Sequence, residues 1–157
     1  MEHPKDVGDR STLAIMLALR ANGYAVYTPF GENTRPDLVI DDGATLSRVQ
    51  CKTGRLLSGA VAFPTCSTYV HHRNPRVAQR DYMGQVDFFA VFCPATTGVY
   101  LIPIADVSTR RQAMLRVEPA RNSQRRHIRH AARYEIGRVD FATAEPGARA
   151  GASGSSA

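Results

Sequence analysis

The sequence of 157 residues is poor in cysteine and lysine and has no long apolar run. Its three cysteines, Cys51, Cys66 and Cys93, cannot form a closed disulfide framework and include no C-x-x-C pair. We therefore expect a reducing, cytoplasmic setting. A histidine pair at residues 71–72 follows Cys66, but the spacing matches no zinc site.

No stretch approaches the ~20 apolar residues that a membrane helix needs. The longest apolar-rich run, residues 13–19, is followed at once by Arg20. Acidic residues precede this run, so we expect no signal peptide and no membrane partner. Hydrophobic residues make up 43% of the chain and charged residues 22%, which favours one globular domain with its own core. We place this domain at residues 1–141 and predict a disordered tail at residues 142–157, which are rich in Ala, Gly and Ser.

Positive charge is present in excess and is unevenly distributed. The net charge is +6, and 18 of the 20 basic residues are arginines, as a GC-rich coding sequence would produce. Residues 110–138 hold nine arginines against two acidic residues, so this block carries +7 and the rest of the chain sums to −1. The bias towards arginine makes each lysine worth explaining, and Lys52 is one of only two.

Apolar periodicity and turn residues predict a helix followed by strands. The helix begins at a cap, Asp9 or Ser11, and ends near Asn22 with Gly23 as its stop. Its expected apolar stripe is Leu13, Met16 and Leu17, widened by Ile15 and Leu19. Strands are predicted at residues 24–27, 37–40, 46–52, 60–63, 86–92 and 98–102, with a turn at 41–43, a loop after Gly54 and a helix at 103–114. This order predicts a mixed α/β domain in which helices back a sheet.

One hairpin of this sheet carries residues suited to phosphodiester hydrolysis. Gln50 and Lys52 project from the same face of a strand, and Asp37 opens the neighbouring strand. The Asp37 carboxylate, the Gln50 amide oxygen and the Cys51 backbone carbonyl are hard ligands suited to Mg²⁺. Lys52 would orient or deprotonate the attacking water and stabilise charge on phosphorus. Arginine serves this role poorly, because its pKa is too high and its planar group is larger.

This pattern alone is short, and a structural interpretation stays open beside the chemical one. In that interpretation, Asp37 caps the turn after Pro36, while Gln50 and Lys52 lie on a solvated strand face.

The segments Pro36-Asp37 and Gln50-Cys51-Lys52 resemble the PD-(D/E)XK nuclease signature in its Q-x-K variant. The wider chain, over residues 7–134, is similar to the bacterial group I intron homing endonucleases of that superfamily. The similar pieces are residues 8–11 (GDRS), 23–24 (GY), 29–33 (PFGEN), 37–43 (DLVIDDG), 48–53 (RVQCKT), 82 (Y), 86–94 (VDFFAVFCP) and 100–103 (YLIP). The resemblance implies a restriction-endonuclease-like core, with a mixed central sheet flanked by helices. It also implies Mg²⁺-dependent cleavage of double-stranded DNA, with Mn²⁺ as a substitute, and a dimer or tetramer.

The sequence departs from this family at the first helix. Such nucleases commonly carry there a Glu that adds to the metal site, and the matching position is Thr12. With Gln50 in place of an acid, Asp37 is the one certain anionic ligand, so metal affinity should fall. Glu32, in the loop before Asp37, is a second accessory candidate.

Two basic segments are candidates for DNA contact. Residues 69–80 are polar and basic, and residues 110–138 hold the arginine block; a polar loop and a solvated helix face are the alternative interpretations. The DNA-binding candidates are His71, His72, Arg73, Arg76 and Arg80 in the first segment and Arg121, Arg125, Arg126 and Arg129 in the second.

Three hypotheses follow from the sequence. The first is a metal-dependent DNA endonuclease. The second is a DNA-binding protein on the same fold that cuts weakly or not at all. The third is an ordinary α/β domain whose basic block binds an acidic partner. Asp87, Tyr82 and the cysteines are expected to be structural.

Overall fold

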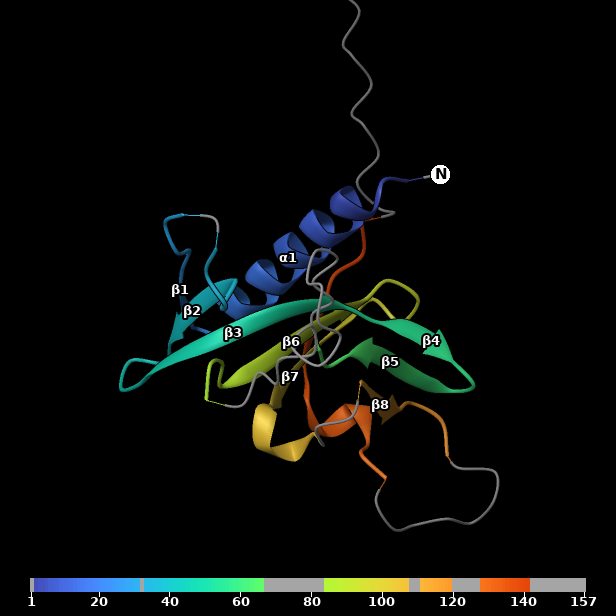
Figure 1. The fold of residues 1–157 in the computed structure, drawn as a ribbon. Helices are drawn as coiled ribbons and strands as arrows, with labels where there is room; N and C mark the ends of the chain where they lie inside the picture. Colours follow the sequence, from blue (N-terminus) through green and yellow to red (C-terminus); the bar gives the residue numbers. More distant parts are fainter. Residues whose placement is uncertain (1, 32, 67–83, 108–110, 120–127, 142–157) are drawn as a thin grey trace, which may run out of the picture.

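The computed structural model describes residues 2–31, 33–66, 84–107, 111–119 and 128–141. One helix and two sheets make up most of this part of the chain (Figure 1). The larger sheet has the strand order β1-β2-β3-β6-β7-β9, and the smaller has the order β4-β5-β8. The elements are α1 (Pro4–Ala21), β1 (Ala25–Tyr27), β2 (Leu38–Asp41), β3 (Leu46–Thr53), β4 (Arg55–Leu57), β5 (Ala60–Pro64), β6 (Phe88–Cys93), β7 (Gly98–Pro103), η1 (Ile104–Asp106), β8 (Gln112–Arg116), η2 (Ala131–Arg133) and β9 (Glu135–Arg138).

Helix α1 begins earlier than the sequence predicts. It starts at Pro4, and the side chain of His3 caps it by accepting a hydrogen bond from the Lys5 backbone N–H. The expected cap at Asp9 or Ser11 is therefore wrong, because proline in the first turn already suits a helix start. The predicted end is confirmed: Asn22 is the C-cap and Gly23 has φ +87°.

The buried face of α1 also differs from the predicted stripe. The buried residues are Ser11, Ala14, Ile15, Ala18 and Leu19. Leu13 and Leu17 were expected in the core, but they are 61% and 58% exposed. Two alanines on the buried face let the helix backbone approach the sheet closely, and this contact selects the face in place of the larger leucines.

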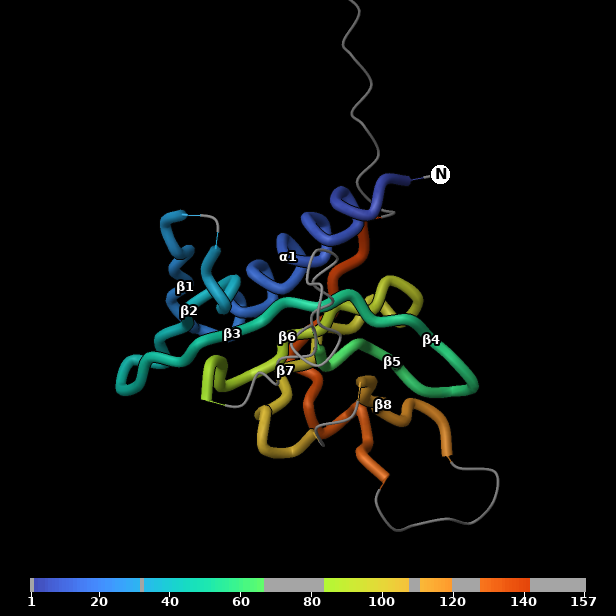
Figure 2. The backbone as a smooth tube through the Cα atoms, viewed as in Figure 1, coloured from blue at the N-terminus to red at the C-terminus, as the bar shows by residue number. Residues whose placement is uncertain are grey.

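Strand pairing places the predicted hairpin at the centre of the larger sheet. β2 and β3 pair antiparallel, as expected, across the turn in which Gly43 has φ +95°. β3 then pairs in parallel with β6, and β6 pairs antiparallel with β7, which confirms the second predicted hairpin. Figure 2 shows β3 running on into β4, so one long stretch of chain passes from the larger sheet into the smaller.

The larger sheet buries a separate core on each face. Alternate residues of β6 point to opposite sides: Phe89, Val91 and Cys93 join a core with β5 and β8, whereas Ala90 and Phe92 join a core with α1. α1 therefore covers one face, and the three-stranded sheet covers part of the other.

Two segments differ from their predicted secondary structure. The loop expected after Gly54 contains β4, and the helix expected at residues 103–114 is a short 3-10 turn, η1, with strand β8 beyond residues 108–110. Ala113 and Leu115 are buried while Gln112 and Met114 are exposed, which is the period of two of a strand on a core. Pairing with β5 decides this conformation, and the local pattern does not reveal it.

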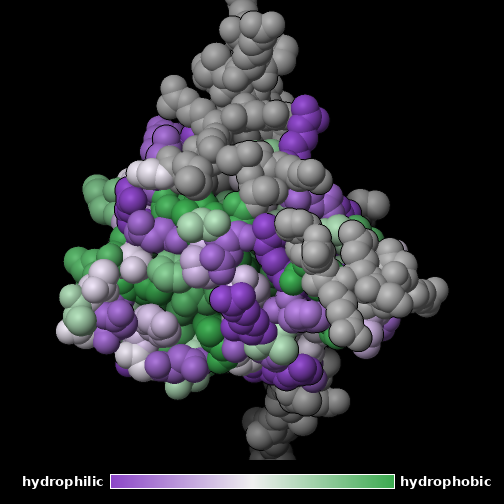
Figure 3. All heavy atoms as spheres, turned by 90° about the horizontal axis from the view of Figure 1, so that it is seen from below, coloured by the Kyte–Doolittle hydropathy of each residue, from purple (hydrophilic) through white to green (hydrophobic). Residues whose placement is uncertain are grey.

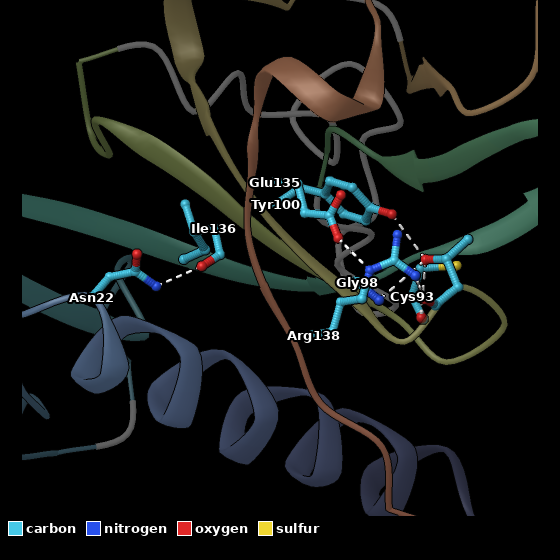
Figure 4. Close-up of polar contacts among 8 residues, drawn as sticks. Asn22, Cys93, Gly98, Tyr100, Glu135, Ile136 and Arg138 are labelled. Atoms are coloured by element: carbon cyan, nitrogen blue, oxygen red, sulfur yellow. Dashed lines mark hydrogen bonds and ion pairs between the residues drawn. The ribbon is translucent and has the colours of Figure 1, made fainter.

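A side-chain hydrogen bond links the C-terminal end of α1 to β9, an edge strand of the larger sheet (Figure 4). The Asn22 amide donates to the Ile136 carbonyl in β9, which joins residues far apart in the chain. On the same strand, Arg138 and Glu135 form an ion pair of 2.8 Å. None of the helices in the described residues is both long enough and apolar enough to span a membrane.

Candidate active site

The candidate site lies where β2 and β3 part. Their pairing reaches Leu38 opposite Val49, and the Asp37 backbone N–H still donates to the Val49 carbonyl at 2.9 Å. Further along β3, the Cys51 backbone N–H has no paired residue of β2 opposite it and donates instead to the Asp37 side chain, at 2.9 Å from its Oδ2. The carboxylate is thus held at the opening between the two strands.

The electrostatic surroundings of Asp37 are mixed. Desolvation by the surrounding protein raises the pKa of Asp37, although part of the residue remains in contact with solvent. The Cys51 N–H and the positive charge of Lys52 act in the opposite direction on that pKa. A carboxylate whose charge is poorly solvated is suited to a cation placed beside it.

Gln50 is the most informative residue of the hairpin. It lies opposite Phe89 of β6 and is half-buried. Its Oε1 atom is fully buried and accepts no hydrogen bond from any residue that the structure describes. A buried oxygen without a donor costs about 1–3 kcal/mol. This burial argues against the alternative in which Gln50 lies on a solvated strand face.

Lys52 points to the same face as Gln50, opposite Val91 of β6. Its Nζ donates to the Cys66 carbonyl at 3.4 Å, just after β5 ends. Sequence reasoning missed this contact, because a backbone carbonyl far along the chain leaves no residue-type signal.

Cys51 contributes its backbone and not its thiol. Its N–H points towards Asp37, and the carbonyl of a strand residue points to the same side as its N–H. The carbonyl therefore faces the opening beyond the last paired residue of β2. Burial, assisted by the charge of Asp37, raises the pKa of the Cys51 thiol well above its usual range, so the thiol stays protonated at neutral pH.

The structure describes one of the two accessory metal-site candidates, Thr12, and not the other, Glu32. Thr12 lies on the helix side of β3, where its hydroxyl donates to the Gly8 carbonyl at 3.1 Å and contacts the Cys51 thiol. Glu32 lies outside the described residues. No group of three His, Cys, Asp or Glu side chains suited to a metal occurs in the described part of the chain. The available donors are therefore a carboxylate, an amide oxygen and a backbone carbonyl, which suit a hard cation such as Mg²⁺.

A family model for PD-(D/E)XK endonucleases matches residues 2–137 of the chain. The chain belongs to the PD-(D/E)XK endonuclease family. Its structure is similar to that of a bacterial homing endonuclease, with a TM-score of 0.60, 24% identity, and 87% of this chain and 88% of the other covered. This likeness confirms the expected restriction-endonuclease-like α/β fold. A comparison with curated proteins finds no matching sequence.

Most of the DNA-binding candidates of this PD-(D/E)XK endonuclease lie outside the described residues. Arg129 is the one that lies within the described residues; its guanidinium donates to the Asp106 carbonyl, and its own carbonyl accepts from Arg116. The candidates outside the described residues are His71, His72, Arg73, Arg76, Arg80, Arg121, Arg125 and Arg126. Contact with DNA by either basic segment stays a prediction.

Asp87 of the endonuclease has the structural role expected for it. Its carboxylate accepts from the Arg48 backbone N–H at 2.7 Å and from the Arg48 guanidinium at 3.2 Å. The same guanidinium donates to the Gly84 carbonyl at 3.1 Å. These contacts lower the pKa of Asp87 and join the start of β6 to β3, two residues before Gln50. Tyr82 lies outside the described residues.

Proposed function

We propose that this endonuclease cleaves double-stranded DNA in a Mg²⁺-dependent reaction, with Mn²⁺ able to replace Mg²⁺. The observation that carries the proposal is the buried Oε1 of Gln50, which has no hydrogen-bond partner among the described residues. It lies on the strand face that also carries Lys52 and beside the opening that holds Asp37. The similarity to a bacterial homing endonuclease supports DNA as the substrate. The three free cysteines favour a cytoplasmic location.

The metal ligands in this proposal are the Asp37 carboxylate, the Gln50 Oε1 and the Cys51 carbonyl. A bound divalent cation supplies Lewis-acid stabilisation of the phosphate charge and a more acidic water. Lys52 contacts the scissile phosphate or the attacking water, because its compact ammonium group orients a water and stabilises negative charge on phosphorus. Asp37 and the Cys51 N–H hold one another in place, which keeps the carboxylate oriented before substrate arrives.

A second candidate function is binding of DNA with slow or no cleavage. It is favoured by Asp37 being the one carboxylate that the described residues bring to the site, and by Thr12, whose hydroxyl is turned towards Gly8 and Cys51. A site with one anionic ligand holds Mg²⁺ more weakly than one with two or three.

Cleavage of supercoiled plasmid DNA with Mg²⁺, Mn²⁺ or EDTA separates these functions. We expect nicked or linear products with either metal, none with EDTA, and loss of cleavage in Asp37→Asn and Lys52→Ala. Asp9→Asn and Lys5→Ala are matched controls on the exposed side of α1 and should cut like the parent. Cleavage that persists in the two site variants would exclude the proposed site. Salt-sensitive DNA binding without cleavage by the parent would support the second function. Equal cleavage of RNA would refute specificity for DNA.

A further inference from the structure

Helix α1 buries one polar side chain against the larger sheet. The other residues of its buried face are alanine, isoleucine and leucine, whereas Ser11 carries a hydroxyl and is only 2% exposed. Hydrophilic residues, purple in Figure 3, lie on the molecular surface, and Ser11 and Thr65 are the two polar residues that the described part of the chain buries. Burial of a hydroxyl is costly unless it has a hydrogen-bond partner.

The partner of Ser11 is the residue that follows Lys52. The Ser11 Oγ lies 2.6 Å from the Oγ1 of Thr53, the last residue of β3, and either hydroxyl can donate. Thr53 pairs with Phe92, which packs in the core shared with α1. Side chains alternate along a strand, so Lys52 points to the opposite face, together with Gln50. The hydroxyl pair and the proposed site therefore lie on the two sides of one short piece of strand.

Strand pairing supports this piece of β3 from one direction. The pairing of β2 with β3 ends at Val49, so residues 50–53 pair with β6 alone among the described strands. Directly after Thr53 the chain leaves the larger sheet for β4, and the Gly54 N–H donates to the Phe92 carbonyl at 2.8 Å. The bond from Ser11 therefore fixes the end of β3 at the junction of the two sheets, one residue beyond Lys52.

We propose that Ser11 and Thr53 are positioning residues for the ammonium group of Lys52, an inference that rests on the function proposed above for that lysine. The Lys52 ammonium ends a flexible four-carbon stem, so its location depends on the direction in which the side chain leaves the backbone. The hydroxyl pair fixes that direction by tying the next residue of the strand to α1. Support of this kind, from residues behind the site, holds a reacting group in productive geometry.

A double variant separates positioning from a purely structural role of this hydrogen bond. Ser11→Ala or Thr53→Val alone leaves one buried hydroxyl without its partner, so each should lower Tm. Combining the two substitutions removes both hydroxyls, which is nearly neutral for stability. The double variant should therefore unfold close to the temperature of the parent and still lack the tie behind Lys52.

Single-turnover cleavage of DNA at saturating enzyme is the first readout. We expect the double variant to cleave about tenfold to a hundredfold more slowly than the parent with an unchanged Kd for DNA, because a small misplacement is enough for such a loss. Thr53→Ser keeps a hydroxyl and should retain most of the rate that Thr53→Val loses. Cleavage by the double variant at the rate of the parent would overturn the proposal.

Asn22→Ala is a matched control at the other end of α1. The Asn22 amide donates to the Ile136 carbonyl of β9, about 16 Å from Ser11 along the helix axis. This variant also loses a hydrogen bond between the helix and the larger sheet, so its Tm should fall while its single-turnover rate matches that of the parent. An equal loss of rate in Asn22→Ala would mean that general loosening of α1 slows cleavage, and would refute a specific role for Ser11.

Side-chain NMR tests the positioning without cleavage, because the chain has only two lysines. With lysine labelled in ¹³C and ¹⁵N, the Cε–Nζ signals come from Lys52 and from Lys5, which is exposed in the first turn of α1. In EDTA, the Lys52 signal of the double variant should shift and relax as a more mobile group, whereas the Lys5 signal should stay the same. An unchanged Lys52 signal would contradict the positioning role. If Lys52 responds but the parent cleaves no DNA, the proposed function fails and the positioning of Lys52 stands.

Discussion

Replacing Gln50 with methionine should stabilise the metal-free protein while removing its response to Mg²⁺. The Oε1 atom of Gln50 is buried without a donor in the described chain, which costs about 1–3 kcal/mol. Methionine has a similar shape and no oxygen to desolvate. We therefore expect Gln50→Met to raise the free energy of unfolding in EDTA by about 1–3 kcal/mol, and each kcal/mol raises Tm by about 2–4 °C in a chain of this length.

Thermal unfolding in EDTA and in a Mg²⁺ series measures both effects. The parent should gain stability with Mg²⁺, by about 2.7 kcal/mol when the metal reaches a hundred times its Kd. Gln50→Met should gain little and should not cleave DNA.

Gln85 provides a matched control for this experiment. Its Oε1 is also buried and unpartnered among the described residues, but it lies in the turn before β6. Gln85→Met should be stabilised in EDTA by a similar amount and should keep the Mg²⁺ response. The reasoning is refuted if Gln50→Met is less stable than the parent in EDTA, or if Mg²⁺ raises the Tm of both Gln50→Met and the parent equally.

Three further predictions concern the same region and its surroundings. Lys52→Arg keeps the charge but should lose most single-turnover cleavage while retaining DNA binding, because guanidinium is larger and does not exchange a proton at neutral pH. The pKa of Asp37 is raised in the folded state. The free energy of unfolding without metal should therefore fall as pH rises from below 3.8, the ordinary pKa of an aspartate, through the folded-state pKa. Urea unfolding at a series of pH values should show this fall in the parent and not in Asp37→Asn. Gly54→Ala should lower the free energy of unfolding by about 1–3 kcal/mol, because the added methyl would lie 2.7 and 2.9 Å from two valine methyl groups. Gly8→Ala, which meets nothing within 4 Å on the outside of α1, should raise it by about 0.5–1 kcal/mol in the same denaturant titration.

The sequence predicts every strand of the larger sheet except β9, but of the smaller sheet it predicts β5 alone. Gly43 and the alternation along β2 and β3 predict a hairpin, because turn geometry and side-chain period act within a few residues. Strand β8 is stabilised by pairing with β5, about fifty residues earlier in the chain. No pattern within the residues of β8 reveals this partner, and local reasoning therefore predicts a helix there. The buried face of α1 was mispredicted for the same reason: the sheet selected Ala14 and Ala18 over the exposed leucines.

The sequence by itself determined the residue types of the candidate site and their order, namely Asp37 at the start of one strand and Gln50 and Lys52 on one face of the next. This was possible because strand alternation is a local property of the backbone. Only the tertiary structure decided that Gln50 Oε1 is buried with no partner in the described chain, that Asp37 accepts from the Cys51 N–H, and that Lys52 reaches the Cys66 carbonyl. Burial, desolvation and backbone contacts depend on residues distant in the chain, and no local pattern encodes them.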